Sequence, residues 1–140
     1  DHQHKELSPK EVLDIFQNEY VNREDTVKLV ECHFKQIDGI QAELTILVNG
    51  EKKVYHGQGN GRLDAISNAI MKHFDIKFSL VTYEEHALQV GSDSQACAYV
   101  GLEVEGVNGI VWGAGIKSDI IDASAYALIS ALNRSNHMNK

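Results

Sequence analysis

The sequence predicts an α+β fold of two pseudo-symmetric βββα units, preceded by a linker helix. The hydrophobic period changes from about 3.6 near the N-terminus to about 2 after residue 27, as expected where a helix gives way to strands. The order of three strand-like segments and one helix-like segment then occurs twice, which indicates an internal duplication. We expect residues 1–24 to form a linker with a helix over 8–20. Residues 25–140 would form one domain, with repeats over about 27–75 and 76–134.

The composition is that of an ordinary globular domain. Of the 140 residues, 43% are hydrophobic and 24% are charged, which suffices for a buried core. The net charge of −7 argues against nucleic acid as a partner. No apolar run approaches the about 20 residues of a membrane helix, and the N-terminus does not resemble a signal peptide. We therefore expect a cytoplasmic protein with no membrane partner, in which Cys32 and Cys97 are free thiols.

The first helix has a well-marked start. Ser8, Pro9 and Glu11 occupy the N-cap, N1 and N3 positions of a capping box. A helix-spaced apolar stripe follows, made of Val12, Ile15, Phe16 and Tyr20. The polar segment 22–26 is expected to end this helix.

The first repeat begins with two strands, over 27–35 and 41–48. Asn49-Gly50 is the favoured two-residue hairpin turn, because both positions require positive φ. A returning strand is expected over 53–56, a glycine-rich turn over 57–61 and a helix over 63–74, where apolar residues recur at spacings of three and four.

The second repeat shows the same order. Strands are expected over 77–87, 96–104 and 110–112, and a helix over 121–132. Gly57-Gln58-Gly59 can be laid over Gly113-Ala114-Gly115. Asp64-Ala65 then falls on Asp122-Ala123 after a two-residue insertion.

The glycine-rich turn does not match a nucleotide-binding loop. A dinucleotide fingerprint needs G-x-G-x-x-G in a parallel βαβ unit, but Arg62 stands at the third glycine position and the strands read as antiparallel hairpins. Gly115-Ile116-Lys117-Ser118 lacks the glycines of a Walker loop. Glycines that let a strand turn into a helix explain both copies, although the first copy holds more glycine than a turn requires.

Three segments resemble the C-terminal regulatory domain of 2-isopropylmalate synthase. They are HGQGNGRLDAISNAI, GSDSQACAYVGLEVEG and GAGIKSDIIDASAYALISALNR, which occur in the family's order. The resemblance extends from about Val27 to Arg134. The family usually has proline at the position of Arg62, so this turn departs from its pattern.

The resemblance implies a dimeric allosteric domain that binds leucine and inhibits the catalytic barrel of the same chain. That barrel, which this chain lacks, condenses acetyl-CoA with 2-oxoisovalerate in leucine biosynthesis and uses a divalent metal; no cofactor is implied for the regulatory domain. An isoleucine-sensing domain of (R)-citramalate synthase is the alternative, and a ligand-free structural dimerisation module is a second one. Carried over from the family, the effector-binding residues are Gly59, Asn60, Gly61, Leu63, Ala65, Leu80, Tyr83, Ala87, Ser118, Asp119 and Ile120.

A free amino acid also suits the residue types of this region. Helix-start N–H groups attract a carboxylate, and Leu63, Leu80 and Ile120 could line a branched side chain. Asp64 or Asp119 could face the ammonium group, or could simply cap a helix. Arg62 could pair with a ligand carboxylate or with an acidic neighbour, or could face solvent. The sequence shows no catalytic constellation and no short metal-ligand spacing of histidines.

Overall fold

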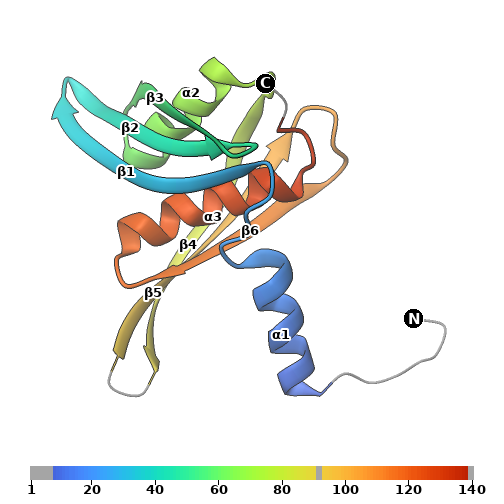
Figure 1. Cartoon of the computed structure of the whole chain (residues 1–140). Helices are drawn as coiled ribbons and strands as arrows, with labels where there is room; N and C mark the ends of the chain where they lie inside the picture. The colour runs from blue at the N-terminus through green and yellow to red at the C-terminus, as the bar shows by residue number, and fades with distance from the viewer. Residues whose placement is uncertain (1–7, 91–92, 139–140) are drawn as a thin grey trace.

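The computed structural model describes residues 8–90 and 93–138 of the chain (Figure 1). The amino-terminal stretch 1–7, which the sequence assigns to the linker, lies outside the described residues. Helix α1 (Pro9–Tyr20) precedes a first unit of β1 (Val27–Ile37), β2 (Gly39–Val48), β3 (Glu51–Gly59) and α2 (Arg62–His73). The second unit consists of β4 (Phe78–Val90), β5 (Asp93–Val104), β6 (Ile110–Lys117) and α3 (Ile120–Arg134).

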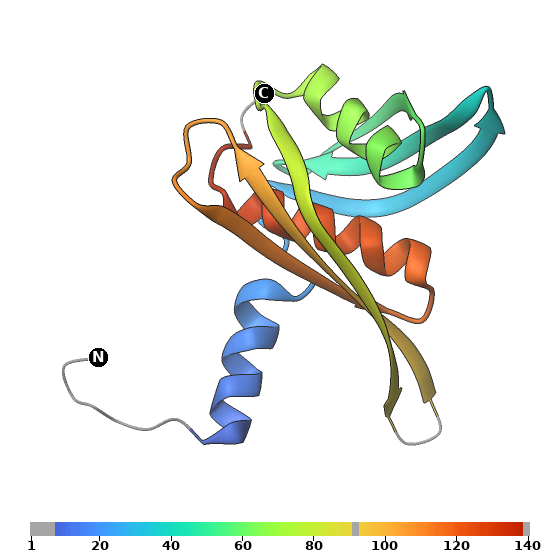
Figure 2. The same ribbon diagram turned by 180° about the vertical axis from the view of Figure 1, so that it is seen from behind.

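Each unit is an antiparallel meander followed by a helix, so the predicted α+β duplication is confirmed. The first sheet has the order β1-β2-β3 and the second the order β4-β5-β6. Asn49 and Gly50 turn the β2–β3 hairpin with φ values of 51° and 85°, as their sequence predicts. All strands run longer than expected, and β4 and β5 extend beyond α2 and α3 (Figure 2).

The two units match in detail along their strands. Pairing shifts at Val30 between β1 and β2, and at Val81 between β4 and β5, which places a bulge at the same point of each sheet. The central strands carry matching rows of buried side chains, namely Ala42, Leu44, Ile46 and Val48 in β2 and Ala98, Val100, Leu102 and Val104 in β5.

The glycines before each helix lie in strands and allow close packing. A Cβ on Gly57 would come within 3.0 Å of the backbone of Ala65 and Ala69 in α2, and one on Gly115 would meet Ala123 and Ala127 of α3 in the same way. Gly57 is therefore equivalent to Gly115. The expected overlay with a two-residue insertion is wrong. Gly57 and Gly115 are as far apart in the sequence as Arg62 and Ile120, where the two helices begin, so the units align without an insertion.

Helix α3 lies at the centre of the molecule. It covers the second sheet and also packs against β1 of the first unit (Figures 1 and 2). Its Leu128, Ile129 and Leu132 are at most 1% exposed. Helix α2 covers the first sheet through Ala65, Ile66, Ala69 and Ile70. Each sheet thus buries an apolar face against a helix.

The connection between α1 and β1 is bound to α3 and β6 by polar side chains. The amide of Asn22 donates to the carbonyl of Ile116 at 3.1 Å and accepts from its N–H at 3.0 Å. The hydroxyl of Ser130 donates to the Tyr20 carbonyl at 2.6 Å, and the amide of Asn133 bonds both backbone groups of Val27. These bonds satisfy backbone groups that secondary structure leaves unpaired.

Arg134 fixes the end of α1 itself. Its guanidinium lies 3.9 Å from the ring centroid of Tyr20, donates to the Trp112 carbonyl at 2.6 Å and lies 3.3 Å from a Glu19 carboxylate oxygen. Phe16 and Tyr20 pack near Tyr99 of β5. The rest of the expected stripe is uncovered, however, since Val12 and Ile15 are 51% and 49% exposed.

Candidate functional site

A cavity of about 330 Å³ opens where the starts of α2 and α3 approach β4. This volume lies within the range of about 300–1,000 Å³ that is usual for small-molecule sites. Apolar groups from both helices line it beside charged groups from α2 and β4. The lining residues are Gly61, Arg62, Leu63, Asp64, Tyr83, Glu85, Ile120, Ile121 and Ser124.

The start of α2 presents its backbone without a side-chain cap. Gly61 is the N-cap and has an extended backbone with φ −139° and ψ 179°, a conformation open to any residue. A Cβ at this position would meet no atom within 4 Å. Neither packing nor conformation therefore requires glycine here, in contrast to Gly57 and Gly59. As a result, no N-cap side chain bonds the first N–H groups of α2, and the residues of this first turn line the cavity.

The start of α3 is closed by its own side chain. Asp119 is the N-cap, and its carboxylate accepts from the N–H of Ile121 at 2.7 Å. The carboxylate of Asp64 has a comparable task, because it accepts from the N–H of Asn60 at 2.9 Å. Both aspartates that could have faced a ligand ammonium group are thus engaged by backbone N–H groups.

Strand β4 contributes a hydrogen-bonded pair to the cavity wall. The Tyr83 hydroxyl donates to a carboxylate oxygen of Glu85 at 2.7 Å. Burial, followed by this bond, raises the pKa of Tyr83 to about 12. Tyr83 therefore remains a neutral donor at physiological pH, and it orients the Glu85 carboxylate.

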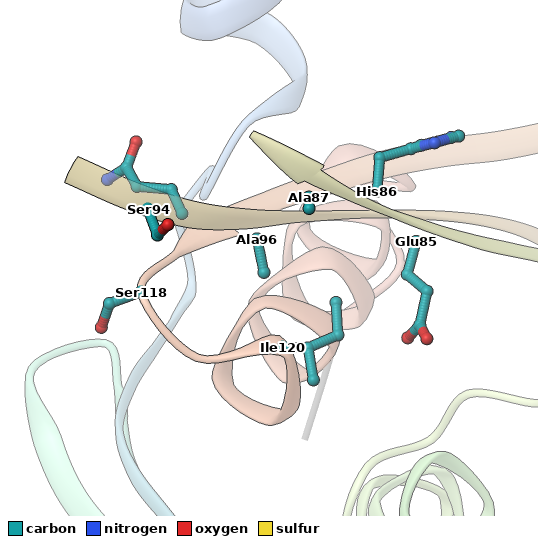
Figure 3. A pocket seen from close by; sticks show the side chains of 8 residues that line it. Glu85, His86, Ala87, Ser94, Ala96, Ser118 and Ile120 are labelled. Carbon is teal, nitrogen blue, oxygen red and sulfur yellow. The ribbon is translucent and has the colours of Figure 1, made fainter. Parts of the chain in front are cut away.

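A second cavity of about 400 Å³ adjoins the first one and shares Glu85 and Ile120 with it. Its further walls come from the β4–β5 hairpin and from the loop after β6. Figure 3 shows the side chains of Glu85 and Ile120 on the same side of the strands, with His86 directed to the opposite side. The lining residues are Glu85, His86, Ala87, Ser94, Gln95, Ala96, Ser118 and Ile120.

The structure brings six of the expected effector-binding residues to these two cavities. Gly61, Leu63, Tyr83 and Ile120 line the first cavity, and Ala87, Ser118 and Ile120 line the second.

The other five expected residues line neither cavity. Ala65 is fully buried in the core, and Gly59 packs against the backbone of α2. Asn60 and Asp119 take part in the helix starts, and Leu80 is a 39% exposed residue of β4.

Sequence reasoning missed Glu85, Ile121 and Ser124 as cavity residues. Glu85 could have been found from its position two residues after Tyr83, since alternate residues of a strand share one face. Arg62 lines the cavity as well, and its guanidinium lies 5.8 Å from the ring centroid of Phe34 in β1. Arg62 is exposed, as the solvent-facing alternative expects, and it forms no ion pair with an acidic side chain among the residues that the structure describes.

The matching strand of the first unit carries a different side chain at the position of Tyr83. Cys32 corresponds to Tyr83 by its distance from the bulge, and it faces α3 near Asp122. Burial, then the Asp122 carboxylate, raises the pKa of the Cys32 thiol to about 12. Both cysteines are free, as expected, although only Cys97 is fully buried.

Within the parts of the chain that the structure describes, no group of three or more His, Cys, Asp or Glu side chains is placed to hold a metal ion. No described helix is long and apolar enough to cross a membrane.

The chain is similar to known proteins over nearly its whole length. A family model described as the LeuA allosteric (dimerisation) domain matches residues 6–136. Proteins named 2-isopropylmalate synthase are 48% identical in Desulfitobacterium hafniense (strain Y51), 44% identical in Helicobacter hepaticus and 38% identical in Brucella suis. The matches cover 95%, 96% and 96% of this chain, but only 24%, 25% and 25% of those relatives, so the chain spans about a quarter of their length.

Proposed function

Since the chain belongs to the LeuA allosteric (dimerisation) domain family, we propose that it is the leucine-sensing part of a 2-isopropylmalate synthase. The effector binds in the cavity between α2, α3 and β4 and inhibits a catalytic barrel that lies outside this chain. The divalent metal that the resemblance implies belongs to that barrel, and effector binding needs no cofactor.

The observation that carries this proposal is the open start of α2 at a cavity that also has apolar walls. Its N–H groups can receive a carboxylate, because a helix N-terminus is partially positive and Gly61 adds no side chain in front of it. Leu63, Ile120 and Ile121 line the same cavity and suit a branched aliphatic side chain. A free branched-chain amino acid combines these two needs in one small molecule.

Helix α3 offers a route from the cavity to α1. Its first turn lines the cavity through Ile120 and Ser124, while its last turns hold the segment after α1 through Ser130 and Asn133. A shift of α3 on effector binding would therefore alter how α1 is held. Such coupling requires different affinities for two states, and is typically worth about 1–3 kcal/mol.

The outer side of α1 supports contact with further protein. Val12 and Ile15 lie at helical spacing and remain about half exposed. In this proposal they meet the remainder of the same enzyme, which is the partner that α1 must influence. The regulatory domain itself pairs with a second copy, in accord with the description of its family.

Calorimetric titration of the chain with leucine, isoleucine and valine tests the proposal. We expect leucine to bind most tightly. Ile120→Ala should weaken binding at least about tenfold, because the loss of even one methylene from a pocket is worth about 1–3 kcal/mol. Val54→Ala, at a 48% exposed position outside the cavity, should bind as the wild type does.

The three amino acids also separate the alternatives. Tightest binding of isoleucine would instead assign the chain to an enzyme of the citramalate synthase type. If none of the three binds or raises the melting temperature at millimolar concentration, the domain is a structural dimerisation module.

A further inference from the structure

Two side chains of opposite charge line the cavity from different walls. Arg62 belongs to the first turn of α2, and Glu85 to β4. Among the residues that the structure describes, no ion pair joins these two side chains. Each is instead held by an uncharged aromatic group, Arg62 by the ring of Phe34 and Glu85 by the hydroxyl of Tyr83.

The remaining charged groups around the cavity have other roles. Asp64 accepts from the backbone N–H of Asn60. His86 lines the adjoining cavity but lies 3.9 Å from Glu84, and its side chain is directed away from Ile120 (Figure 3). Glu85 therefore supplies the carboxylate on this wall of the cavity. It can accept several hydrogen bonds, of which Tyr83 supplies one.

We infer that Glu85 binds the ammonium group of the amino-acid effector and that Arg62 binds its carboxylate. The inference rests on the proposed function and assigns the two charged ends of the ligand to named side chains. A zwitterion satisfies both charges at once, which a fatty acid or an amine cannot do. Tyr83 is a positioning residue, because it acts on the ligand through Glu85.

Arg62 gains a role that proline could not have. The family pattern has proline at this position, which would only preset the backbone at the start of α2. Arginine can instead offer a fork of N–H donors to a carboxylate, next to the uncapped N–H groups of the same turn. Its guanidinium also lies 5.8 Å from the ring centroid of Phe34, within the range of a cation–π contact.

Binding of three ligands tests the assignment: leucine, 4-methylpentanoate, which lacks the ammonium group, and leucinamide, which lacks the carboxylate. Glu85→Gln should weaken leucine binding about tenfold or more, since charge-assisted hydrogen bonds are the strong ones. It should leave binding of 4-methylpentanoate unweakened. Arg62→Gln should weaken leucine binding by a similar factor and leave the binding of leucinamide unchanged.

Matched controls separate local charge from net charge. Glu84→Gln removes the neighbouring carboxylate from the other face of β4, and Lys72→Gln removes a cation from the far end of α2; both should bind leucine as the wild type does. Tyr83→Phe should weaken leucine binding less than Glu85→Gln does. In the Glu85→Gln background, Tyr83→Phe should weaken leucine binding no further, which marks a positioning role.

The outcomes distinguish this inference from the proposed function. If wild-type protein binds leucine and Glu85→Gln binds it equally well, the assignment of the ammonium site is wrong. An unchanged affinity of Arg62→Gln overturns the carboxylate site in the same way. If the wild type binds no branched-chain amino acid, the proposed function fails first. Both substituted side chains are exposed, so the variants should fold, which thermal melting verifies.

Discussion

Replacing Gly61 by aspartate should stabilise the domain and at the same time weaken effector binding. The extended backbone of Gly61 accepts any residue, and a Cβ there meets nothing within 4 Å. Aspartate caps a helix better than glycine by a few tenths of a kcal/mol. A negative charge at the N-terminus adds about 0.3–1 kcal/mol, and loss of glycine freedom in the unfolded chain adds about 0.4–1 kcal/mol. Repulsion from Asp64 in the same turn offsets part of this.

The net stabilisation is about 1 kcal/mol. For a domain of this length it corresponds to a rise of about 3 °C in melting temperature, measurable by calorimetry. The new carboxylate would occupy the N–H groups that receive the effector and would repel the effector carboxylate. We expect leucine affinity to fall about tenfold or more. Gly61→Asn is the matched control, because asparagine caps about as well but carries no charge, and it should weaken leucine binding less.

Two results would refute this reasoning. A lower melting temperature for Gly61→Asp would show that the α2 start is not the open, uncapped terminus described above. Wild-type leucine affinity in the same variant would show that the effector carboxylate binds elsewhere.

Three further predictions concern packing, the attachment of α1 and pH. Gly57→Ala should lower the free energy of unfolding by about 2–3 kcal/mol in urea titrations, because its Cβ would collide with the α2 backbone, whereas Gly61→Ala should change it by only a few tenths. Arg134→Ala removes a carbonyl hydrogen bond and a cation–π contact and should cost about 1–3 kcal/mol; hydrogen exchange should then quicken in α1 but not in α2. Because the pKa of Tyr83 is raised to about 12, the folded state keeps a proton that the unfolded state loses near pH 10. The free energy of unfolding should therefore fall as the pH rises from about 10 to 12, and Tyr83→Phe should flatten this decline.

The sequence predicts the architecture well because the duplication repeats its own signals. Buried residues alternate in β2 as in β5, and Asn49-Gly50 has the φ values that its hairpin turn requires. Helix α1 begins after Ser8 through the predicted capping box. These are local preferences, which a single chain segment can express by itself.

Other features of the fold and the site depend on tertiary contacts between segments that are distant in the sequence. The expected turn at Gly57 is a strand, because its glycine serves contact with a helix that lies later in the chain. The stripe of α1 gave no sign that Val12 and Ile15 would stay uncovered. Glu85 was missed, since its place beside α3 arises only when β4 crosses the helix start.

The differences between the two units locate the site more sharply than their similarities do. At the helix N-caps, Gly61 in the first unit stands where Asp119 closes its own helix in the second. At the matching strand positions, Cys32 corresponds to Tyr83 and Phe34 to Glu85, as their registers with β2 and β5 show. An exact duplicate would present two equal cavities or none. Because α3 packs on β1 while β4 keeps an acidic, hydrogen-bonded wall opposite an open helix start, the cavity between α2, α3 and β4 is polar and asymmetric. That asymmetry is what a chiral zwitterion requires, and substitutions that restore the symmetry, such as Gly61→Asp or Glu85→Phe, should weaken leucine binding about tenfold or more while the scaffold still folds.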